Sequence, residues 1–582
     1  MHVIATAGHV DHGKSALLRA LTGMEPDRWE EERRRGLTID LGFVWTHDQR
    51  EAIAFVDVPG HERFVGNMLA GVGPVPAVLF VVAADEGWMP QSAEHLTALH
   101  ALGVSHGVLA VTKTDLMEPD LAAEEALDTI RTTTLGDIPW VGVSARTGDG
   151  LPELRRALDD LVARLPSSDA TAPVRLWVDR SFTIRGAGLV VTGTLAAGTI
   201  RAGDTLELAR IQARFVVREL QTLNRHVEEV SGVARVALNL RGPNRVEIRR
   251  GDALMTPGSY RCTAVVDART SLCSPHELPR EVLVHVGAAT VACGVRPLGE
   301  DTARLTLEEA LPLRVGDRVV LRHDRGIAGG AILLDVDPPI LNRRGATRRR
   351  AGDLETYLNA PEGMTELRRR GIVREGVLRA VGIEPPVPPL VGDWLVAPEL
   401  AAALRERLAT MVARRVDDPS AWPLKVEEAR KALELPDVRL VPPLVSAGFT
   451  IRNGAIVPQE APDTLAPVVR DALSTLEAKL HARGFVVPAE EELAGLGLGT
   501  AEIAAAVRVG RMVRLAPGVV LLPETLAYAV DVLAHLAQPF TAGEAREALG
   551  TSRKVVVPLL EYLALHGRTR RGADGQHSVT GR

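Results

Sequence analysis

Lysine is scarce in this chain of 582 residues: only six of its 68 basic side chains are lysines, and arginine supplies the rest. The two residue types are not interchangeable where a compact point charge is needed, and Lys14 and Lys113 fall in motifs described below. Cysteine is nearly absent as well. Cys262, Cys273 and Cys293 show no close pairing, so neither a zinc site nor a disulfide framework is expected, which fits a reducing cytoplasm.

Long apolar segments are also missing. The best apolar run, Pro76 to Ala84, is too short to cross a bilayer, and the chain starts at Met1 without the basic region of a signal peptide. We therefore expect a soluble, cytoplasmic protein with no membrane partner. The net charge of −6, from 68 basic and 74 acidic residues, excludes a polycation, so any RNA-binding surface must be local.

The length requires several domains, since a typical domain holds about 150 residues. Up to about residue 165, short apolar strands alternate with helical patterns, which indicates a parallel sheet flanked by helices. Strand patterns typical of small barrels follow to about residue 345, and beyond it short amphipathic helices precede hairpin-like pairs, as in winged helices. The predicted boundaries are 1–170 for the α/β domain, 171–258 and 259–345 for two β-barrels, and 346–408, 409–462, 463–526 and 527–582 for four winged helices.

A phosphate-binding motif follows the first predicted strand and leads into a predicted helix. It fits G-x-x-x-x-G-K-S and consists of Gly8, His9, Val10, Asp11, His12, Gly13, Lys14 and Ser15. In such a P-loop the backbone amides surround the β-phosphate, the lysine reaches the β- and γ-phosphates, and the serine hydroxyl ligates Mg²⁺. The alternative is a chance glycine turn. It is disfavoured because further nucleotide-binding motifs follow in order along the chain.

Two further segments predict a γ-phosphate switch. Asp57 ends an apolar strand and can hold Mg²⁺ through water, while the amide of Gly60 can donate to the γ-phosphate. His61 comes next, where a GTPase positions its attacking water, and we predict a catalytic role for it. Thr38 lies in a charged segment near residues 27 to 40 and is expected to ligate Mg²⁺ only when the γ-phosphate is present. The alternative is that this segment is a solvated surface loop.

The base-binding residues come at the ends of two later strands. The Asp115 carboxylate can accept both N1–H and the exocyclic amine of guanine, which favours GTP over ATP, and the stem of Lys113 packs on the base. A backbone amide of Ser144 or Ala145 is expected to reach the guanine carbonyl. Thr112 departs from the usual asparagine, whose amide tethers the loop, and this departure is expected to weaken nucleotide binding.

Together these motifs resemble the EF-Tu-like translational GTPases. The resemblance rests on the P-loop, on Arg35 to Ile39 and on Asp57 to Glu62, and it implies that Val10 and Ile39 form a hydrophobic gate beside His61. Segments near Val178 and from Gly186 to Thr194 resemble the start of the family's second domain, a barrel that grips the aminoacyl end of tRNA. GTP and Mg²⁺ are the implied cofactors.

Within this family the chain is similar to the selenocysteine-specific elongation factors, SelB. Ordinary EF-Tu ends after its second barrel, whereas this chain continues with winged-helix patterns; SelB also has threonine at the position of Thr112. The segments Gly550 to Lys554, Leu560 to Leu563 and Thr569 to Gly572 resemble the last winged helix of SelB, which binds the selenocysteine insertion hairpin (SECIS) in messenger RNA.

The resemblance implies a selenocysteyl pocket of Asp179, Arg180 and Arg235. Selenols are more acidic than thiols, whose pKa is about 8.5, so the cargo is a selenolate that two guanidinium groups would favour over a seryl hydroxyl. Asp179 would fix one arginine or meet the α-amino group. The alternative is a structural ion pair of Asp179 with Arg180.

The resemblance also implies an RNA-binding surface at the C-terminus, for which the alternative is a solvated charged face. Ser552 is expected to cap a helix, and the hairpin-binding residues are expected to be Arg553, Lys554, Arg568, Arg570 and Arg571. The implied protein is a monomeric GTPase, stimulated by the ribosome, that delivers selenocysteyl-tRNA to UGA codons marked by the hairpin. Another EF-Tu-like translational GTPase, or a GTP-switched RNA-binding regulator, remains the alternative.

Overall fold

The structure is a computed structural model that divides into two compact units, residues 1–388 and 389–582. It describes residues 1–26, 38, 40–46, 52–73, 75–185, 188–243, 246–357, 360–416, 423–459, 465–572 and 575–580. Of the predicted switch segment near 27 to 40, only Thr38 and Asp40 are described, so Arg35 and Ile39 lie outside the described residues, as do Gly186 and Ala187.

The first unit begins with a six-stranded sheet in the order β2-β3-β1-β4-β5-β6. Its strands are β1 His2–Ala7, β2 Gly42–Trp45, β3 Ile53–Asp57, β4 Ala77–Ala83, β5 Gly107–Thr112 and β6 Trp140–Gly142. All neighbours pair in parallel except β2 and β3, which are antiparallel. Parallel strands are buried on both faces and therefore read as apolar runs, and every residue of β4 is buried.

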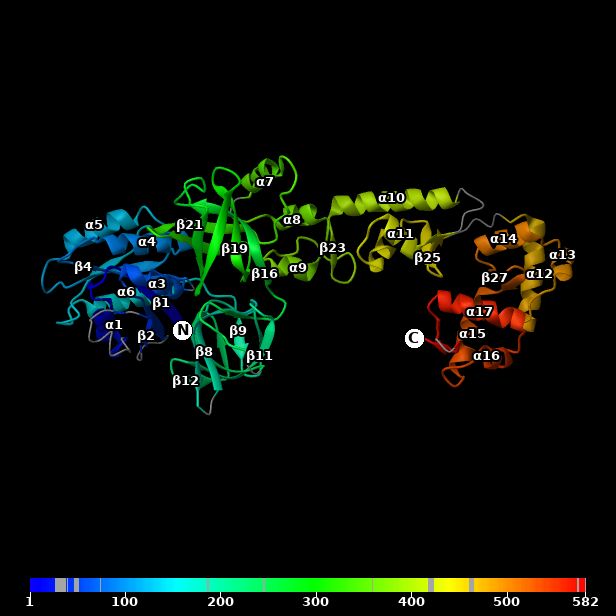
Figure 1. The fold of residues 1–582 in the computed structure, drawn as a ribbon, viewed down its shortest axis with the longest axis horizontal. Helices are drawn as coiled ribbons and strands as arrows, with labels where there is room; N and C mark the ends of the chain where they lie inside the picture. Colours follow the sequence, from blue (N-terminus) through cyan, green and yellow to red (C-terminus); the bar gives the residue numbers. More distant parts are fainter. Residues whose placement is uncertain are drawn as a thin grey trace. The chain divides into compact units, whose positions relative to one another are not determined.

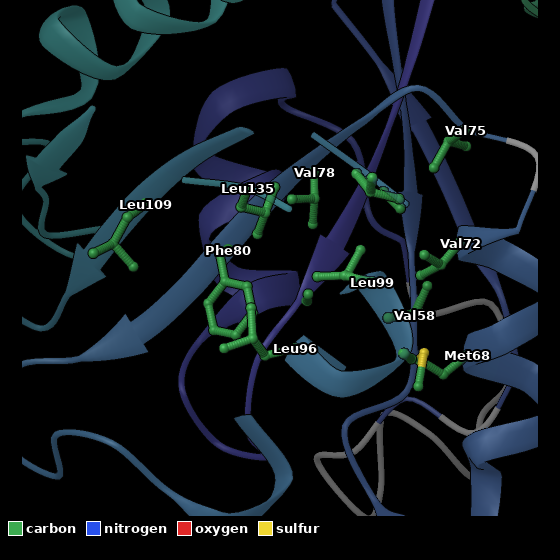
Figure 2. Packing of buried hydrophobic residues seen from close by; sticks show 14 of the residues in the cluster. Val58, Met68, Val72, Val75, Val78, Phe80, Leu96, Leu99, Leu109 and Leu135 are labelled. Atoms are coloured by element: carbon green, nitrogen blue, oxygen red, sulfur yellow. The ribbon is translucent and has the colours of Figure 1, made fainter. Parts of the chain in front are cut away.

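Helices cover both faces of this sheet (Figure 1). They are α1 Lys14–Thr22, η1 Glu62–Phe64, α3 Val65–Val72, α4 Pro90–Leu102, α5 Asp120–Ile130 and α6 Leu151–Arg164. Residues of α3, α4 and α5 pack on one face, and those of α1 and α6 on the other. Phe80 of β4 lies between Leu96 and Leu99 of α4 on one side and Leu135 on the other (Figure 2). The loops after β1, β3 and β5 therefore meet at the carboxyl edge of the sheet, where ligands bind in such folds.

A first β-barrel follows. Its strands are β7 Arg175–Ile184, β8 Gly188–Leu195, β10 Thr205–Leu208, β11 Ala213–Thr222, β12 Arg225–Val227, β14 Ala234–Arg241 and β15 Ala253–Met255, with β9 Thr199–Arg201 and β13 Glu229–Ser231 forming a separate pair. The order is β10-β15-β7-β8-β14-β11-β12, and pairing of β10 with β11 closes the barrel. Apolar side chains of the strands fill its interior.

The second barrel closes in the order β16-β19-β18-β17-β20-β21. Its strands are β16 Arg261–Ser271, β17 Glu281–Val286, β18 Ala289–Pro297, β19 Thr302–Leu313, β20 Arg318–His323 and β21 Gly326–Asp335. Helix α4 packs directly on β21, because a Cβ atom at Gly330 would lie 2.7 Å from the Cβ of Ala101. The unit continues with α7 Ala346–Glu355, α8 Gly363–Arg370, β22 Ile372–Arg374 and α9 Glu375–Ala380.

In its described residues, the second unit alternates helices with β-hairpins, as winged helices do. Its first part holds β23 Trp394–Val396, α10 Pro398–Val416, β24 Leu424–Lys425, α11 Val426–Ala432, η2 Val438–Leu440, η3 Pro442–Leu444, β25 Phe449–Arg452 and β26 Ala455–Pro458. Its second part holds α12 Pro467–Arg483, α13 Glu490–Gly495, α14 Thr500–Arg508, β27 Val513–Ala516, β28 Val519–Leu521, α15 Pro523–Ala534, α16 Ala542–Ala548, α17 Arg553–Leu565, β29 Thr569–Arg571 and β30 His577–Val579.

Two of the predicted domain boundaries are wrong, because each cuts a helix. The boundary between 408 and 409 falls within α10, and the boundary between 526 and 527 falls within α15. The second error has a clear cause: Leu526 and Leu533 of α15 share one core with Val513 of the preceding hairpin and Leu560 of α17. A continuous core leaves no polar linker in the sequence to mark the boundary.

Candidate functional site

The P-loop lies between β1 and α1, and two glycines make its course possible. Gly8 has φ +130°, and a Cβ atom there would lie 2.1 Å from the carbonyl oxygen of Val81. Gly13 adopts the left-handed conformation directly before α1 begins at Lys14. Side chains larger than hydrogen are strained in both places, so the motif's glycines are required by the backbone.

Lys14 is buried beneath this loop. Its Nζ donates to the carbonyl oxygens of Gly8 and His9, at 3.0 and 2.6 Å. Burial lowers the pKa of Lys14 to about 8, although the carboxylates of Asp57 and Asp11 favour the charged form. The ammonium group is thus held at the inner surface of the loop, where phosphate oxygens would meet it.

Three side-chain oxygens that suit Mg²⁺ converge beside the loop. Ser15 Oγ donates to Asp57 Oδ2 at 2.6 Å, and the Thr38 hydroxyl lies 3.0 Å from Ser15 Oγ. Thr6, which we had not predicted, donates to the other carboxylate oxygen of Asp57 at 2.9 Å and accepts from the Val58 amide. Hydroxyl and carboxylate oxygens are the ligands that Mg²⁺ prefers, so this donor set fits the ion.

The loop after β3 presses against the P-loop. A Cβ atom at Gly60 would lie 2.6 Å from Lys14 Nζ and 2.7 Å from the Val10 nitrogen, so only glycine fits there. His61 follows directly before η1, half-buried, and its Nδ1 accepts a hydrogen bond from the Arg63 amide at 3.2 Å. With Nδ1 an acceptor, the neutral ring carries its proton on Nε2. The structure thus places His61 beside Gly60.

Thr112 forms the hydrogen bond to the P-loop that an asparagine would be expected to form at this position. Its hydroxyl donates to the His12 carbonyl oxygen at 2.7 Å, and the side chain is buried. A hydroxyl thereby links the base-binding loop to the P-loop as the amide of asparagine would. The expectation that Thr112 weakens nucleotide binding loses its physical basis.

The predicted guanine-binding residues lie together beyond β5 and β6. Asp115 accepts from Ser144 Oγ at 2.7 Å and from Arg146 Nε at 2.9 Å. The hydroxyl of Ser144 first, then a backbone amide and the charge of Arg146, hold the pKa of Asp115 below its usual value, so the carboxylate stays an acceptor. The Ser144 amide donates to the Asp149 carbonyl oxygen, which leaves Ala145 to offer an amide to the base. Lys113 Nζ contacts two acids, Asp85 and Glu86.

Helix α4 holds the P-loop from the side, a role that we had not predicted from the sequence. Gln91 Oε1 accepts from the Val10 amide at 3.0 Å, and His95 Nδ1 accepts from the Gly8 amide at 3.1 Å. Burial lowers the pKa of His95 to about 3, so the ring stays neutral and can accept. Polar residues spaced four apart on a helix share one face, and that spacing was the available signal.

The three predicted pocket residues lie at the face between the first barrel and β2. Asp179 and Arg180 sit at a β-bulge of β7, and Arg235 on β14 forms a two-pronged ion pair with Asp179, whose second oxygen lies 2.8 Å from Arg235 Nη2. Thr192 donates to the same carboxylate at 2.7 Å. The partner of Asp179 is therefore Arg235, and the alternative pair of Asp179 with Arg180 does not form.

Arg180 reaches toward the nucleotide domain instead. Its Nη2 lies 2.9 Å from Asp40 Oδ2 and donates to the Leu41 carbonyl oxygen at 2.5 Å. Phe43 lies under both arginines: the guanidinium carbon of Arg235 is 3.7 Å from its ring centroid and that of Arg180 is 5.4 Å away. Arg180, Arg235 and Phe43 all line a cavity of about 290 Å³ between β2 and the barrel.

At the C-terminal end, all five predicted RNA-binding side chains are exposed. Arg553 and Lys554 open α17, and Arg568, Arg570 and Arg571 lie at β29. Ser552 occupies the N-cap position, but its side chain makes no capping hydrogen bond, so the predicted cap is only positional. Thr541 caps α16 instead, in a reciprocal capping box with Glu544.

Known families match both ends of the chain. Residues 1–164 match the family described as elongation factor Tu GTP binding domain, and residues 531–577 match the family described as elongation factor SelB, winged helix. Elongation factor Tu 2 of Streptomyces avermitilis is 33% identical over 353 residues, which cover 56% of this chain and 89% of that protein.

A relative with a more specific name is also similar to this chain. The selenocysteine-specific elongation factor of Desulfomicrobium baculatum is 37% identical over 373 residues, 61% of this chain and 58% of that protein. A crystal structure of bacterial selenocysteine-specific elongation factor EF-Sec superposes with a TM-score of 0.71 at 25% identity, over 100% of both chains. The chain belongs to the EF-Tu-like translational GTPases. Its match to the Desulfomicrobium SelB spans a little more than half of that relative's length.

The SelB-like fold assigned from sequence, with a P-loop domain, barrels and winged helices, is confirmed by these matches. Among the helices in the described ranges, none is both long and apolar enough to cross a bilayer.

Proposed function

We propose that this chain is an elongation factor that hydrolyses GTP and delivers selenocysteyl-tRNA to ribosomes at UGA codons marked by a messenger RNA hairpin. It would work in the cytoplasm as a monomer. The observation that carries this proposal is the cavity between β2 and the first barrel, where Arg180 and Arg235 lie over the Phe43 ring. Two guanidinium groups at one apolar wall suit a small anionic side chain such as a selenolate.

Asp179 would contribute to the selectivity of this cavity by orienting Arg235. It is 6% exposed and does not line the cavity, so it meets the cargo only through Arg235. The carboxylate orients the Arg235 guanidinium, which would then present its remaining edge to the selenolate. A seryl hydroxyl, having no charge, gains little from two cations, so the serine-charged form of the same tRNA would bind more weakly.

The nucleotide residues would act as follows. Lys14 and the P-loop amides bind the β- and γ-phosphates, and Asp115 with the Ala145 amide selects guanine. Ser15, Thr38 and Asp57 would hold Mg²⁺, with Asp57 acting through water; the ion would neutralise charge developing on the phosphates. His61 would orient the water that attacks the γ-phosphate, and Val10 would border its path.

One short segment links these two sites. Thr38 contacts Ser15 at the predicted metal site, while Asp40 and Leu41, two and three residues later, hold Arg180 of the cavity. A change of nucleotide that moves Thr38 would therefore move the groups bound to Arg180. We propose that cargo binding depends on GTP through this segment.

Replacing Thr112 with Ala should raise the dissociation constant for GTP about five- to tenfold, because the tether to the His12 carbonyl oxygen is lost and a net hydrogen bond is worth about 1 kcal/mol. Thr112→Asn is the matched control and should bind GTP nearly as well as the unaltered chain. Stopped-flow measurement of fluorescent GTP release tests both. Unchanged release in Thr112→Ala would contradict the tether.

The proposed function as a whole is tested by binding of selenocysteyl-tRNA, seryl-tRNA of the same species and an ordinary aminoacyl-tRNA, each with GTP and with GDP. We expect tight binding only of selenocysteyl-tRNA with GTP. Equal affinity for all three would favour a general EF-Tu-like factor. Hairpin binding without any aminoacyl-tRNA binding would favour a GTP-switched RNA-binding regulator.

Arg180→Gln should reduce the preference for selenocysteyl- over seryl-tRNA by about ten- to a hundredfold, since a hydrogen bond to a charged group is worth about 1.5–3 kcal/mol. Arg180 is a cleaner probe than Arg235, whose loss would leave Asp179 buried without its partner and destabilise the barrel. Arg201→Gln, an exposed ion-paired arginine of the same barrel, is the control. A preference unchanged in Arg180→Gln would refute the pocket.

A further inference from the structure

Five exposed arginines gather where the second barrel meets α7. Arg343 and Arg344 precede the helix, Arg348 and Arg349 lie in its first turns, and Arg296 comes from β18 of the barrel. Arg296 Nη2 donates to Thr347 Oγ1 at 2.9 Å, which ties the strand to the helix. We call these five residues the arginine patch.

The patch arginines are not neutralised by ion pairs with described residues. None of the five forms an ion pair with a described residue, whereas some exposed arginines elsewhere do, such as Arg201 with Glu229 and Arg379 with Glu375. Cations gathered on one surface repel one another and raise the local concentration of anions. Because the chain as a whole carries −6, the patch is a local concentration of positive charge.

A buried network holds the patch rigidly on the barrel. Arg350, the next residue of α7, is 2% exposed; its Nε donates to Asp267 Oδ2 at 2.7 Å and its Nη2 to Asp335 Oδ2 at 2.5 Å. Arg304 of the barrel also binds Asp267, at 2.7 Å. Farther along the helix, Arg269 donates to the Leu354 carbonyl oxygen at 3.0 Å. The arginines next to Arg350 are therefore presented by a fixed scaffold.

We propose that the arginine patch binds the phosphate backbone of RNA. Guanidinium groups match phosphate geometry with two parallel hydrogen bonds, and several of them on one rigid surface can follow successive phosphates. This inference rests on the proposed function in so far as RNA is already a partner of the chain. It adds an RNA-binding surface separate from both the cavity at Arg180 and the surface at Arg553.

An anionic membrane is the other polyanion to consider, and the helix argues against it. A membrane-surface helix keeps an apolar face free for insertion. Here the apolar residues Ala351 and Leu354 of α7 are 7% and 0% exposed, already packed against the protein. The exposed side of the helix start is left to the arginines, which suits phosphate groups in water.

The test compares two proteins of equal charge. In the first, Arg343, Arg344, Arg348 and Arg349 are each changed to Gln; in the control, the exposed ion-paired residues Arg131, Arg156, Arg201 and Arg379 are changed to Gln. A third protein with Lys at the four patch positions keeps the charge. Arg350 stays unchanged in all of them, and thermal unfolding checks that the network is intact.

Dissociation constants are measured between 50 and 200 mM KCl for three probes: a selenocysteine tRNA transcript, the messenger hairpin and ribosomes. For the probe that meets the patch, we expect the Gln variant to bind about tenfold or more weakly. The slope of log K against log salt should become shallower by about 0.9 for each duplex phosphate that the Gln variant no longer neutralises. The control should match the unaltered protein, and the Lys variant should keep most of the slope. Which probe responds identifies the source of the phosphates.

Two results would overturn the proposal that the arginine patch binds RNA. If the Gln variant and the control bind all three probes equally, the arginines do not bind RNA. Phosphatidylglycerol vesicles serve as a fourth probe: if the Gln variant loses binding only to them, a lipid surface is the partner. Failure of the unaltered protein to bind any RNA would overturn the proposed function as well, so the two failures are distinguishable.

Discussion

Replacing His61 with Ala should lower ribosome-stimulated GTP hydrolysis by about a hundred- to ten-thousandfold, the usual contribution of a positioned general acid or base. GTP affinity should remain, because His61 comes after Gly60 and lies outside the P-loop and the guanine-binding residues. Single-turnover hydrolysis with programmed ribosomes measures the rate, and equilibrium binding of a fluorescent GTP analogue measures affinity. The expected outcome is a stalled, GTP-bound complex.

A second histidine of the same domain serves as the control. His106 lies in the loop between α4 and β5, and its Nδ1 is 3.1 Å from Ser105 Oγ. His106→Ala should therefore hydrolyse GTP at the unaltered rate. Hydrolysis by His61→Ala at the same rate as His106→Ala would mean that another group orients the water.

Changing both Arg553 and Lys554 to Ala should weaken binding of the messenger hairpin by at least about a hundredfold. Each cation forms a charge-assisted hydrogen bond worth about 1.5–3 kcal/mol, so two together exceed the roughly 2.7 kcal/mol of a hundredfold change. GTP and tRNA binding should be unaffected, since both use the first unit. Gel-shift titration with a labelled hairpin measures the loss.

The winged-helix unit offers a closely matched control. Lys479 and Arg483 are also one lysine and one arginine on a single helix, α12, and both pair with Glu492. Changing them to Ala removes the same charges without touching α17. Equal loss of hairpin binding in both double variants would point to a non-specific charge effect and would remove α17 from the site.

Much of the nucleotide site could be predicted, because its residues follow one another along the chain. The P-loop conformation is set by Gly8 and Gly13 within a few positions, and Asp57 and Thr112 come where apolar strands end. Parallel strands bring their carboxyl ends to one edge, so strand ends alone predict that these residues meet. The contacts of Gln91 and His95 with the P-loop were not predicted, because polar side chains on a helix give the same sequence pattern whether they contact a loop or the core.

Which charged side chains form ion pairs could not be predicted from the sequence in this way. Asp179 stands next to Arg180 but pairs with Arg235, 56 positions away, and Arg180 pairs with Asp40, 140 positions away. A bulge in β7 redirects neighbouring side chains, and no local pattern reveals it. Likewise, the exposed Arg348 and Arg349 of the patch and the buried Arg350 are consecutive in sequence and indistinguishable there.

The sequence by itself determined the nucleotide motifs, the order of sheet, barrels and winged helices, and the choice of guanine, because each depends on residue types at short spacings. The tertiary structure alone decided that Thr112 tethers the P-loop, that α15 joins the last two winged helices into one core, and that the cavity arginines are linked to Thr38. Those features depend on which distant surfaces come together, and packing of the whole chain determines that.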